Sequence, residues 1–232
     1  MTSFDVESLF LLLIFANRPY NHSITSVTLG SCELGAVDKC TFLGTIVDNK
    51  LSFAHHINHI VSKLSKSAGI LYKIRDSLPS KARLDYYYAF VYPYMIYNVI
   101  VWGSTNKIHL NPLVIQQKRI IRTICNSSKF DHTTPLFYRL NLLQFFDIYT
   151  FFLCVYMYKE INNNNNFTVT HNRNTRNRDQ TVPEFHRLSV SQHAVSFSGP
   201  TVWNSIPASI RNIQSIHVFK RTLKSHFISQ YV

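Results

Sequence analysis

One stretch decides the fold that the sequence predicts: residues 41–75, which read TFLGTIVDNKLSFAHHINHIVSKLSKSAGILYKIR. Its first part, residues 42–47, is a short apolar run that ends at Asp48 and Asn49, a pattern typical of a buried strand followed by a turn. Beyond this turn, apolar residues recur at helical spacing over residues 54–75. We therefore expect a long helix with one stripe against a core. The stripe consists of Ile57, Ile60, Val61, Leu64, Ala68 and Leu71.

The polar side of this predicted helix is basic. On a helical wheel His59, Lys63, Lys66 and Lys73 fall roughly opposite the apolar stripe. The helix is thus predicted to be apolar inward and basic outward.

A second basic face is predicted further along the chain. We expect a helix over residues 111–125 that begins at Asn111 and Pro112, with Leu113, Ile120, Ile121 and Ile124 facing a core. Lys118, Arg119 and Arg122 share much of another face of this helix. The pattern favours contact with phosphate at both basic faces, and two merely solvated faces are the alternative.

Other elements follow from periodicity and from breaking residues. A helix over residues 80–92 is predicted to be capped by Ser77 and to stop or bend at Pro93. Residues 134–140 and 216–231 are also expected to be helical, and residues 142–158 are apolar on nearly all sides, which indicates a helix buried in protein. The Asn-rich run at 162–166 is expected to be a loop. Ser198, Gly199 and Pro200 predict a turn before the buried anchor Trp203.

Positive charge is concentrated in two segments. The 232-residue chain carries 24 basic and 12 acidic residues, a net charge of +12. Residues 49–125 hold 11 basic and two acidic residues, and residues 162–232 hold eight basic and two acidic residues. Such a distribution is typical of a protein that contacts nucleic acid in more than one place.

The cysteines and the N-terminal segment indicate an intracellular protein, nuclear or cytoplasmic. The four cysteines are widely spaced and include no Cys-x-x-Cys pair, so neither a disulfide framework nor a zinc site is expected. The apolar run at residues 9–16 follows Asp5 and Glu7, where a signal peptide needs positive charge, and it is too short to span a bilayer.

Separated motifs in a fixed order carry a resemblance to a known family. They are Phe42-Leu43-Gly44 through Ile57, Gly69-Ile70-Leu71-Tyr72-Lys73-Ile74-Arg75, Tyr92-Pro93-Tyr94, Ile100-Val101-Trp102-Gly103, Gln117-Lys118-Arg119 and Gly199-Pro200-Thr201-Val202-Trp203-Asn204. From about Ile24 to the C-terminus, the chain resembles the region after the polymerase active site in jockey-like reverse transcriptases of non-LTR retrotransposons.

The resemblance implies a mainly α fold: a thumb-like helical bundle with a small N-terminal antiparallel β element and a C-terminal helical segment. The implied division is an unmatched segment (1–23), a primer-grip-like β element (24–53), a thumb-like bundle (54–161), an Asn/Arg-rich linker (162–182) and a C-terminal segment (183–232). Within the β element we expect a strand over 24–29, turn residues over 30–35 and a strand over 40–47.

The same resemblance assigns roles to two groups of residues. Phe42, Leu43 and Gly44 are primer-grip-like, although Gly44 is equally interpreted as an ordinary strand glycine. A basic thumb binds RNA or an RNA/DNA hybrid, and its expected contacts are Lys63, Lys66, Lys73, Lys118, Arg119, Arg122 and His59.

No catalytic residues are predicted. Two-metal polymerase chemistry requires clustered carboxylates, and none of the twelve acidic residues forms an Asp-Asp pair. We therefore expect no cofactor, with Mg²⁺ needed only by an intact polymerase of the family. The histidines at 55, 56 and 59 have a spacing compatible with metal binding, but we interpret them as structural or phosphate-facing.

We therefore hypothesise that the chain is a catalytically incomplete part of an RNA-directed DNA polymerase and that it retains binding to the nucleic-acid backbone. An intact element polymerase is a further expected partner. The alternative is a decayed element remnant that acts only as a structural fragment and self-associates through its uncovered palm-facing surface, which includes Leu29, Phe42 and Ile46.

Overall fold

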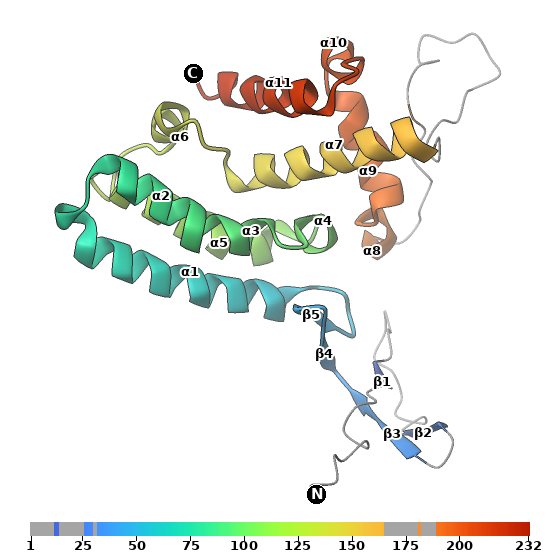
Figure 1. Ribbon diagram of the computed structural model, residues 1–232. Helices are drawn as coiled ribbons and strands as arrows, with labels where there is room; N and C mark the ends of the chain where they lie inside the picture. The colour runs from blue at the N-terminus through green and yellow to red at the C-terminus, as the bar shows by residue number, and fades with distance from the viewer. Residues whose placement is uncertain (1–11, 14–25, 30–31, 165–180, 182–188) are drawn as a thin grey trace, which may run out of the picture. The chain divides into compact units, whose positions relative to one another are not determined.

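The computed structural model describes residues 12–13, 26–29, 32–164, 181 and 189–232, and the chain divides into two compact units, residues 1–59 and 60–232 (Figure 1). A mainly helical fold with a small antiparallel β element near the N-terminus and helices at the C-terminus confirms the predicted fold class. The predicted segment 1–23, apart from Leu12 and Leu13, and residues 165–180 of the predicted linker lie outside the described residues. The predicted domain boundaries stay predictions.

The first unit contains two small sheets. Strand β3 (Cys32–Val37) pairs in parallel with β1 (Leu12–Leu13) and antiparallel with β2 (Ser26–Leu29). The predicted strand over residues 24–29 corresponds to β2. The predicted turn over residues 30–35 is wrong from Cys32 onward, because these residues complete the ladder with β2.

The second sheet corrects the prediction of one buried strand over residues 40–47. Strands β4 (Lys39–Phe42) and β5 (Thr45–Asp48) form a hairpin in which Phe42 pairs with Thr45. Leu43 and Gly44 form its two-residue turn, with φ values of 45° and 74°. Positive φ at both turn residues matches the right-handed twist of the strands, and glycine adopts it without strain. The apolar run is therefore folded back on itself, and Phe42 and Leu43 are 66% and 72% exposed.

Asp48 organises the link between the hairpin and the first helix. Its buried carboxylate accepts hydrogen bonds from the backbone amides of Lys50 (3.0 Å) and Ser52 (2.9 Å) and from the Ser52 hydroxyl (3.0 Å). The Ser52 hydroxyl in turn accepts from the amide of Ala54 at 3.3 Å, where α1 (Ala54–Ile74) begins. This local capping places a turn at Asp48, as predicted.

In the second unit, α1 continues into the short 3₁₀ helix η2 (Arg75–Ser77) and is followed by α2 (Ser80–Phe90), α3 (Tyr92–Ile96) and α4 (Val99–Trp102). The predicted helix over 80–92 therefore ends two residues early, at a break around Val91 (φ −120°) that lets Pro93 enter the first turn of α3. Ser77 does not cap α2, since it lies in η2 and Pro79 occupies the cap position.

Helix α5 (Lys107–Ile124) begins four residues before the predicted start at Asn111. The side chain of Asn106 accepts a hydrogen bond from the amide of Ile108 at 3.0 Å and so caps the helix. Pro112 lies inside the helix on its exposed side, where water can satisfy the carbonyl that lacks a partner. Leu113, Ile120, Ile121 and Ile124 are buried, as predicted.

The remaining helices are α6 (Thr134–Leu140), α7 (Phe145–Asn164), α8 (Ser189–Gln192), α9 (Val195–Ser205), α10 (Ala208–Arg211) and α11 (Ile216–Ser229). Helix α7 extends through the first part of the asparagine run that was predicted to be a loop. The side-chain amide of Asn162 donates to the carbonyl of Tyr158 at 2.8 Å, which supports the last turns of the helix.

Helix α7 is the centre of the second unit. It packs against α3, α4, α5, α9 and α11, and Figure 1 shows α11 running alongside it. Phe145, Ile148, Leu153, Cys154 and Met157 are fully buried, which confirms the prediction of a helix buried in protein. Among the described residues no helix is by itself long and apolar enough to cross a membrane, whereas α6 and α7 together, bent by 50°, meet the criteria of length and composition.

Two glycines allow close packing against α7. A Cβ atom on Gly199 would lie 2.6 Å from Sδ of Met157, and one on Gly103 would lie 2.5 Å from a ring carbon of Tyr149. The predicted turn at Ser198, Gly199 and Pro200 is wrong, because these residues lie inside α9. Gly199 serves helix packing there rather than a turn conformation. The predicted anchor Trp203 is buried, with its ring 5.8 Å from that of Phe219.

We expect opposite stability effects from two glycine-to-alanine substitutions. Gly103→Ala forces a methyl group against Tyr149 and the Val99 carbonyl, so it should lower the free energy of unfolding by about 1–3 kcal/mol. Gly69→Ala, on α1, meets nothing within 4 Å and should raise it by about 0.5–1 kcal/mol. Urea unfolding of both variants measures the difference, and equal effects would contradict the close contact at Gly103.

Candidate nucleic-acid interface

The outward face of α1 carries the first group of predicted contacts. His59, Lys66 and Lys73 are exposed, and Lys63 is half-buried, while Ile60, Leu64, Ala68 and Leu71 are buried. The predicted inward and outward assignment of this helix is therefore confirmed. Ile70, on the same exposed side as the lysines, is 54% exposed, so the face is not uniformly polar.

The second group lies on α5. Arg119 is exposed, and Lys118 and Arg122 are half-buried. The burial of Ile120, Ile121 and Ile124 on the opposite side leaves these cations on the open side of the helix. Nε of Arg122 donates to the backbone carbonyl of Asp131 at 3.0 Å, which fixes the guanidinium near the end of α5.

A cavity of about 680 Å³ lies where α1 and α5 end. Its lining includes four cations and one carboxylate, which leaves three positive charges. The lining residues are Tyr72, Arg75, Asp76, Arg119, Arg122, Thr123, Asn126, Ser127, Ser128 and Lys129. We call this cavity the basic pocket. Of the predicted contacts, the pocket brings together only Arg119 and Arg122.

The arginine at the end of α1 is held over an aromatic ring. The Arg75 guanidinium lies 4.1 Å from the ring centroid of Tyr72, and its Nε lies 3.4 Å from the Asp76 carboxylate. Within the described ranges this is the one ion pair between side chains of Lys or Arg and Asp or Glu. The other three cations of the pocket are thus without a carboxylate partner among the described residues.

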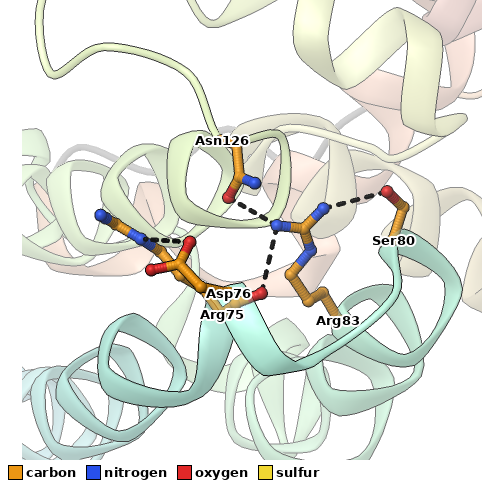
Figure 2. A network of polar contacts seen from close by, with 5 residues as sticks. All are labelled: Arg75, Asp76, Ser80, Arg83 and Asn126. Atoms are coloured by element: carbon orange, nitrogen blue, oxygen red, sulfur yellow. Dashed lines mark hydrogen bonds and ion pairs between the residues drawn. The ribbon is translucent and has the colours of Figure 1, made fainter.

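Arg83 holds residues beside the basic pocket in place through hydrogen bonds. This buried guanidinium donates to the side-chain oxygen of Asn126, to the carbonyl of Arg75 at 3.4 Å and to the Ser80 hydroxyl at 2.9 Å. Figure 2 shows these bonds joining Arg75 of η2, Ser80 at the start of α2 and Asn126 just after α5. Asn126 has φ 52°, a left-handed conformation that asparagine tolerates, so the chain turns sharply there.

Sequence reasoning missed Arg75, Lys129 and Arg83 as parts of this site. Arg75 was recognised only as the last residue of a motif, and Lys129 lies in a segment of zero net charge. Arg83 carries no signal in the sequence, because only the fold shows that it is buried. Their grouping depends on contacts between residues that are far apart in the chain.

The other predicted contacts remain untested. Phe42, Leu43 and Gly44 form the exposed tip of the β4–β5 hairpin, and their primer-grip-like role stays a prediction. Of the three clustered histidines, His56 is structural: its buried ring accepts a hydrogen bond from the amide of Ile46 at 3.3 Å. Burial and the neighbouring His59 lower the pKa of His56, which favours the neutral ring that can accept this bond.

Within the described part of the chain, no group of three or more His, Cys, Asp or Glu side chains is arranged to hold a metal ion. Asp48, which follows the hairpin, uses its carboxylate in the capping bonds described above.

Comparison with known proteins finds similarity to an RNA-directed DNA polymerase. The chain is 29% identical over 125 residues to the RNA-directed DNA polymerase from mobile element jockey of Drosophila melanogaster. The match covers 53% of this chain and 13% of the relative, so it concerns a small part of that protein. It confirms the resemblance found in the sequence. No protein-family model matches the chain, and no solved structure matches it.

Removal of the Arg83 brace should destabilise the protein. Arg83→Met keeps the buried alkyl chain but leaves Asn126 and the Arg75 carbonyl without their donor, so we expect a loss of about 2–3 kcal/mol in the free energy of unfolding. The matched control is Arg139→Met on α6, an exposed site where the change should stay within about 0.5 kcal/mol. Equal urea midpoints for the two variants would contradict the bracing role.

Proposed function

We propose that this chain is a catalytically incomplete part of a reverse transcriptase that holds RNA or an RNA/DNA hybrid through its sugar-phosphate backbone. The observation that carries the proposal is the pair of basic outer faces on α1 and α5 in a chain similar to an RNA-directed DNA polymerase. In this proposal the two helices belong to a thumb-like bundle.

The arrangement of the cations supports recognition of the backbone rather than of base sequence. Lys66, Lys73 and Arg119 are exposed on regular helices, where long flexible side chains reach phosphates in many registers. Lysine and arginine contacts of this kind release condensed counterions, so the affinity depends on salt. We therefore expect little preference among sequences.

We also propose that the chain does not polymerise nucleic acid by itself and requires no metal for binding. Its twelve acidic residues include no adjacent aspartate pair of the kind that two-metal chemistry uses. In this proposal Mg²⁺ is needed only when an intact element polymerase supplies the carboxylates. The chain would then present nucleic acid to that partner.

The charge of the α1 face provides the main test. Replacing Lys63, Lys66 and Lys73 together by Ala should reduce the salt slope of RNA/DNA hybrid binding by about two to three, since each lysine neutralises about one phosphate. Binding is measured by fluorescence anisotropy over a series of salt concentrations, and the same preparation with Mg²⁺ and nucleotides should leave the primer unextended.

The matched control replaces three exposed cations outside the two basic faces, Lys81, Arg139 and Lys159, by Ala. It removes the same charge but should keep most of the salt slope. Equal slopes for the two triple variants would show that only net charge matters. An unfolded α1 variant, detected by circular dichroism, would contradict the outward assignment of the lysines.

A second candidate function rests on the exposed tip of the β4–β5 hairpin. Phe42 and Leu43 are both more than half exposed, and exposed apolar side chains favour self-association. In this alternative the chain is a self-associating remnant without selected activity.

Size-exclusion chromatography with light scattering separates the two candidates. The alternative predicts oligomers without nucleic acid that dissociate in a Phe42→Thr, Leu43→Asn variant, while the nucleic-acid proposal predicts a monomer. The double variant leaves the pairing of β4 with β5 in place, because Asn-Gly is a favoured two-residue turn. A monomeric wild-type chain would exclude the alternative.

A further inference from the structure

The basic pocket differs in kind from the open α1 face. It is a half-open hollow of about 680 Å³ lined by residues from α1, η2, α5 and the segment after α5, and it includes Arg119 and Arg122 of the α5 face. Cavities of roughly 300–1,000 Å³ hold ligands of the size of a drug molecule. A single nucleotide is of that size, while a continuous duplex is not.

The charge in the pocket exceeds what the structure itself neutralises. Both α1 and α5 end here, and each helix C-terminus contributes roughly half a negative charge. Arg75, Arg119, Arg122 and Lys129 outweigh these two ends and Asp76 together, which leaves about two positive charges. A phosphomonoester carries about −1.5 to −2 at neutral pH, whereas an internal phosphodiester carries one negative charge.

Polar donors complete the lining. The side-chain oxygen of Asn126 accepts from Arg83, which turns its amide group toward other acceptors. The backbone amide of Ser128 is engaged by the Asp131 carboxylate at 2.8 Å, and this bond fixes the loop that carries Lys129. The lining thus combines cationic side chains with neutral hydrogen-bond donors, and local hydrogen bonds hold its backbone in place. Donors of both kinds bind phosphate oxygens.

We propose that the basic pocket binds the terminal nucleotide of a nucleic-acid strand through its phosphomonoester. Arg119, Arg122 and Lys129 contact the phosphate, and the Tyr72 ring, held by Arg75, forms the wall beside the sugar and base. The inference deepens the proposed function and rests on it, because the remainder of the strand follows the basic faces. The site recognises a strand end, which backbone binding alone does not.

The test compares oligoribonucleotides of one sequence that carry a phosphate at the 5′ end, a phosphate at the 3′ end, or hydroxyl groups at both. We expect one of the phosphorylated forms to bind about tenfold more tightly than the hydroxyl form, since two or more charge-assisted hydrogen bonds are gained. The two phosphorylated arms establish which end is recognised.

Variants separate the pocket from the α1 face. Arg119→Gln with Lys129→Gln changes two exposed pocket residues and should bring the affinity ratio of phosphorylated to hydroxyl oligonucleotide close to one. Lys66→Gln with Lys73→Gln, the control on the α1 face, should weaken both oligonucleotides and keep the ratio. If the double variant is unstable, Lys129→Gln alone replaces it in the test. This change alters one exposed side chain and should give an affinity ratio between one and the wild-type value.

The outcomes are distinguishable. If the wild-type chain binds no oligonucleotide, the proposed function fails together with the inference. If it binds all three with equal affinity, or if the pocket variant keeps the ratio while the α1 variant loses it, the inference alone is overturned.

Discussion

The structure of the second unit depends on the burial of the apolar side chains of α7. An apolar helix of this kind requires neighbours on several sides, and α3, α4, α5, α9 and α11 provide them. Trp102 stacks on Phe145 at 5.6 Å, and Tyr158 stacks on Phe219 at 4.5 Å. Burying each large aromatic side chain contributes roughly 2–3 kcal/mol, so these contacts decide where the flanking helices lie.

Several motifs of the family resemblance are parts of this packing. Gly103 and Gly199 allow α7 to approach closely, and the indole of Trp102 donates to the carbonyl of Tyr97 at 2.8 Å. Buried Gln117 donates to the Tyr87 hydroxyl and to the Leu143 carbonyl. Asn204 exchanges hydrogen bonds with the backbone of Thr181. These residues are structural in this chain, and the candidate chemistry lies with the charged residues between them.

Periodicity predicted the long helices and the basic faces because their burial follows a repeating pattern along the chain. The predictions failed where a contact distant in sequence overrides a local signal. Gly199 and Pro200 resemble a turn, yet packing on Met157 keeps them in α9. The run at Phe42 resembles a buried strand, yet Gly44 closes a hairpin within it. The basic pocket was not predicted, because it joins Arg75 to Lys129 across two helices and a loop.

In the two proposals, the α1 face and the basic pocket bind phosphate under different physical conditions. Lys66 and Lys73 on α1 are exposed to water, and salt screens their attraction over a Debye length of about 8–10 Å. In the pocket, several cations converge on one hollow, so a single phosphate there would contact more than one of them at short range. Arg83 holds part of this lining in place, because its part-buried hydrogen bonds join Arg75 of η2 to Asn126 in the loop after α5. A rigid concave site of this kind selects its ligand by shape as well as charge, while the α1 face selects by charge alone.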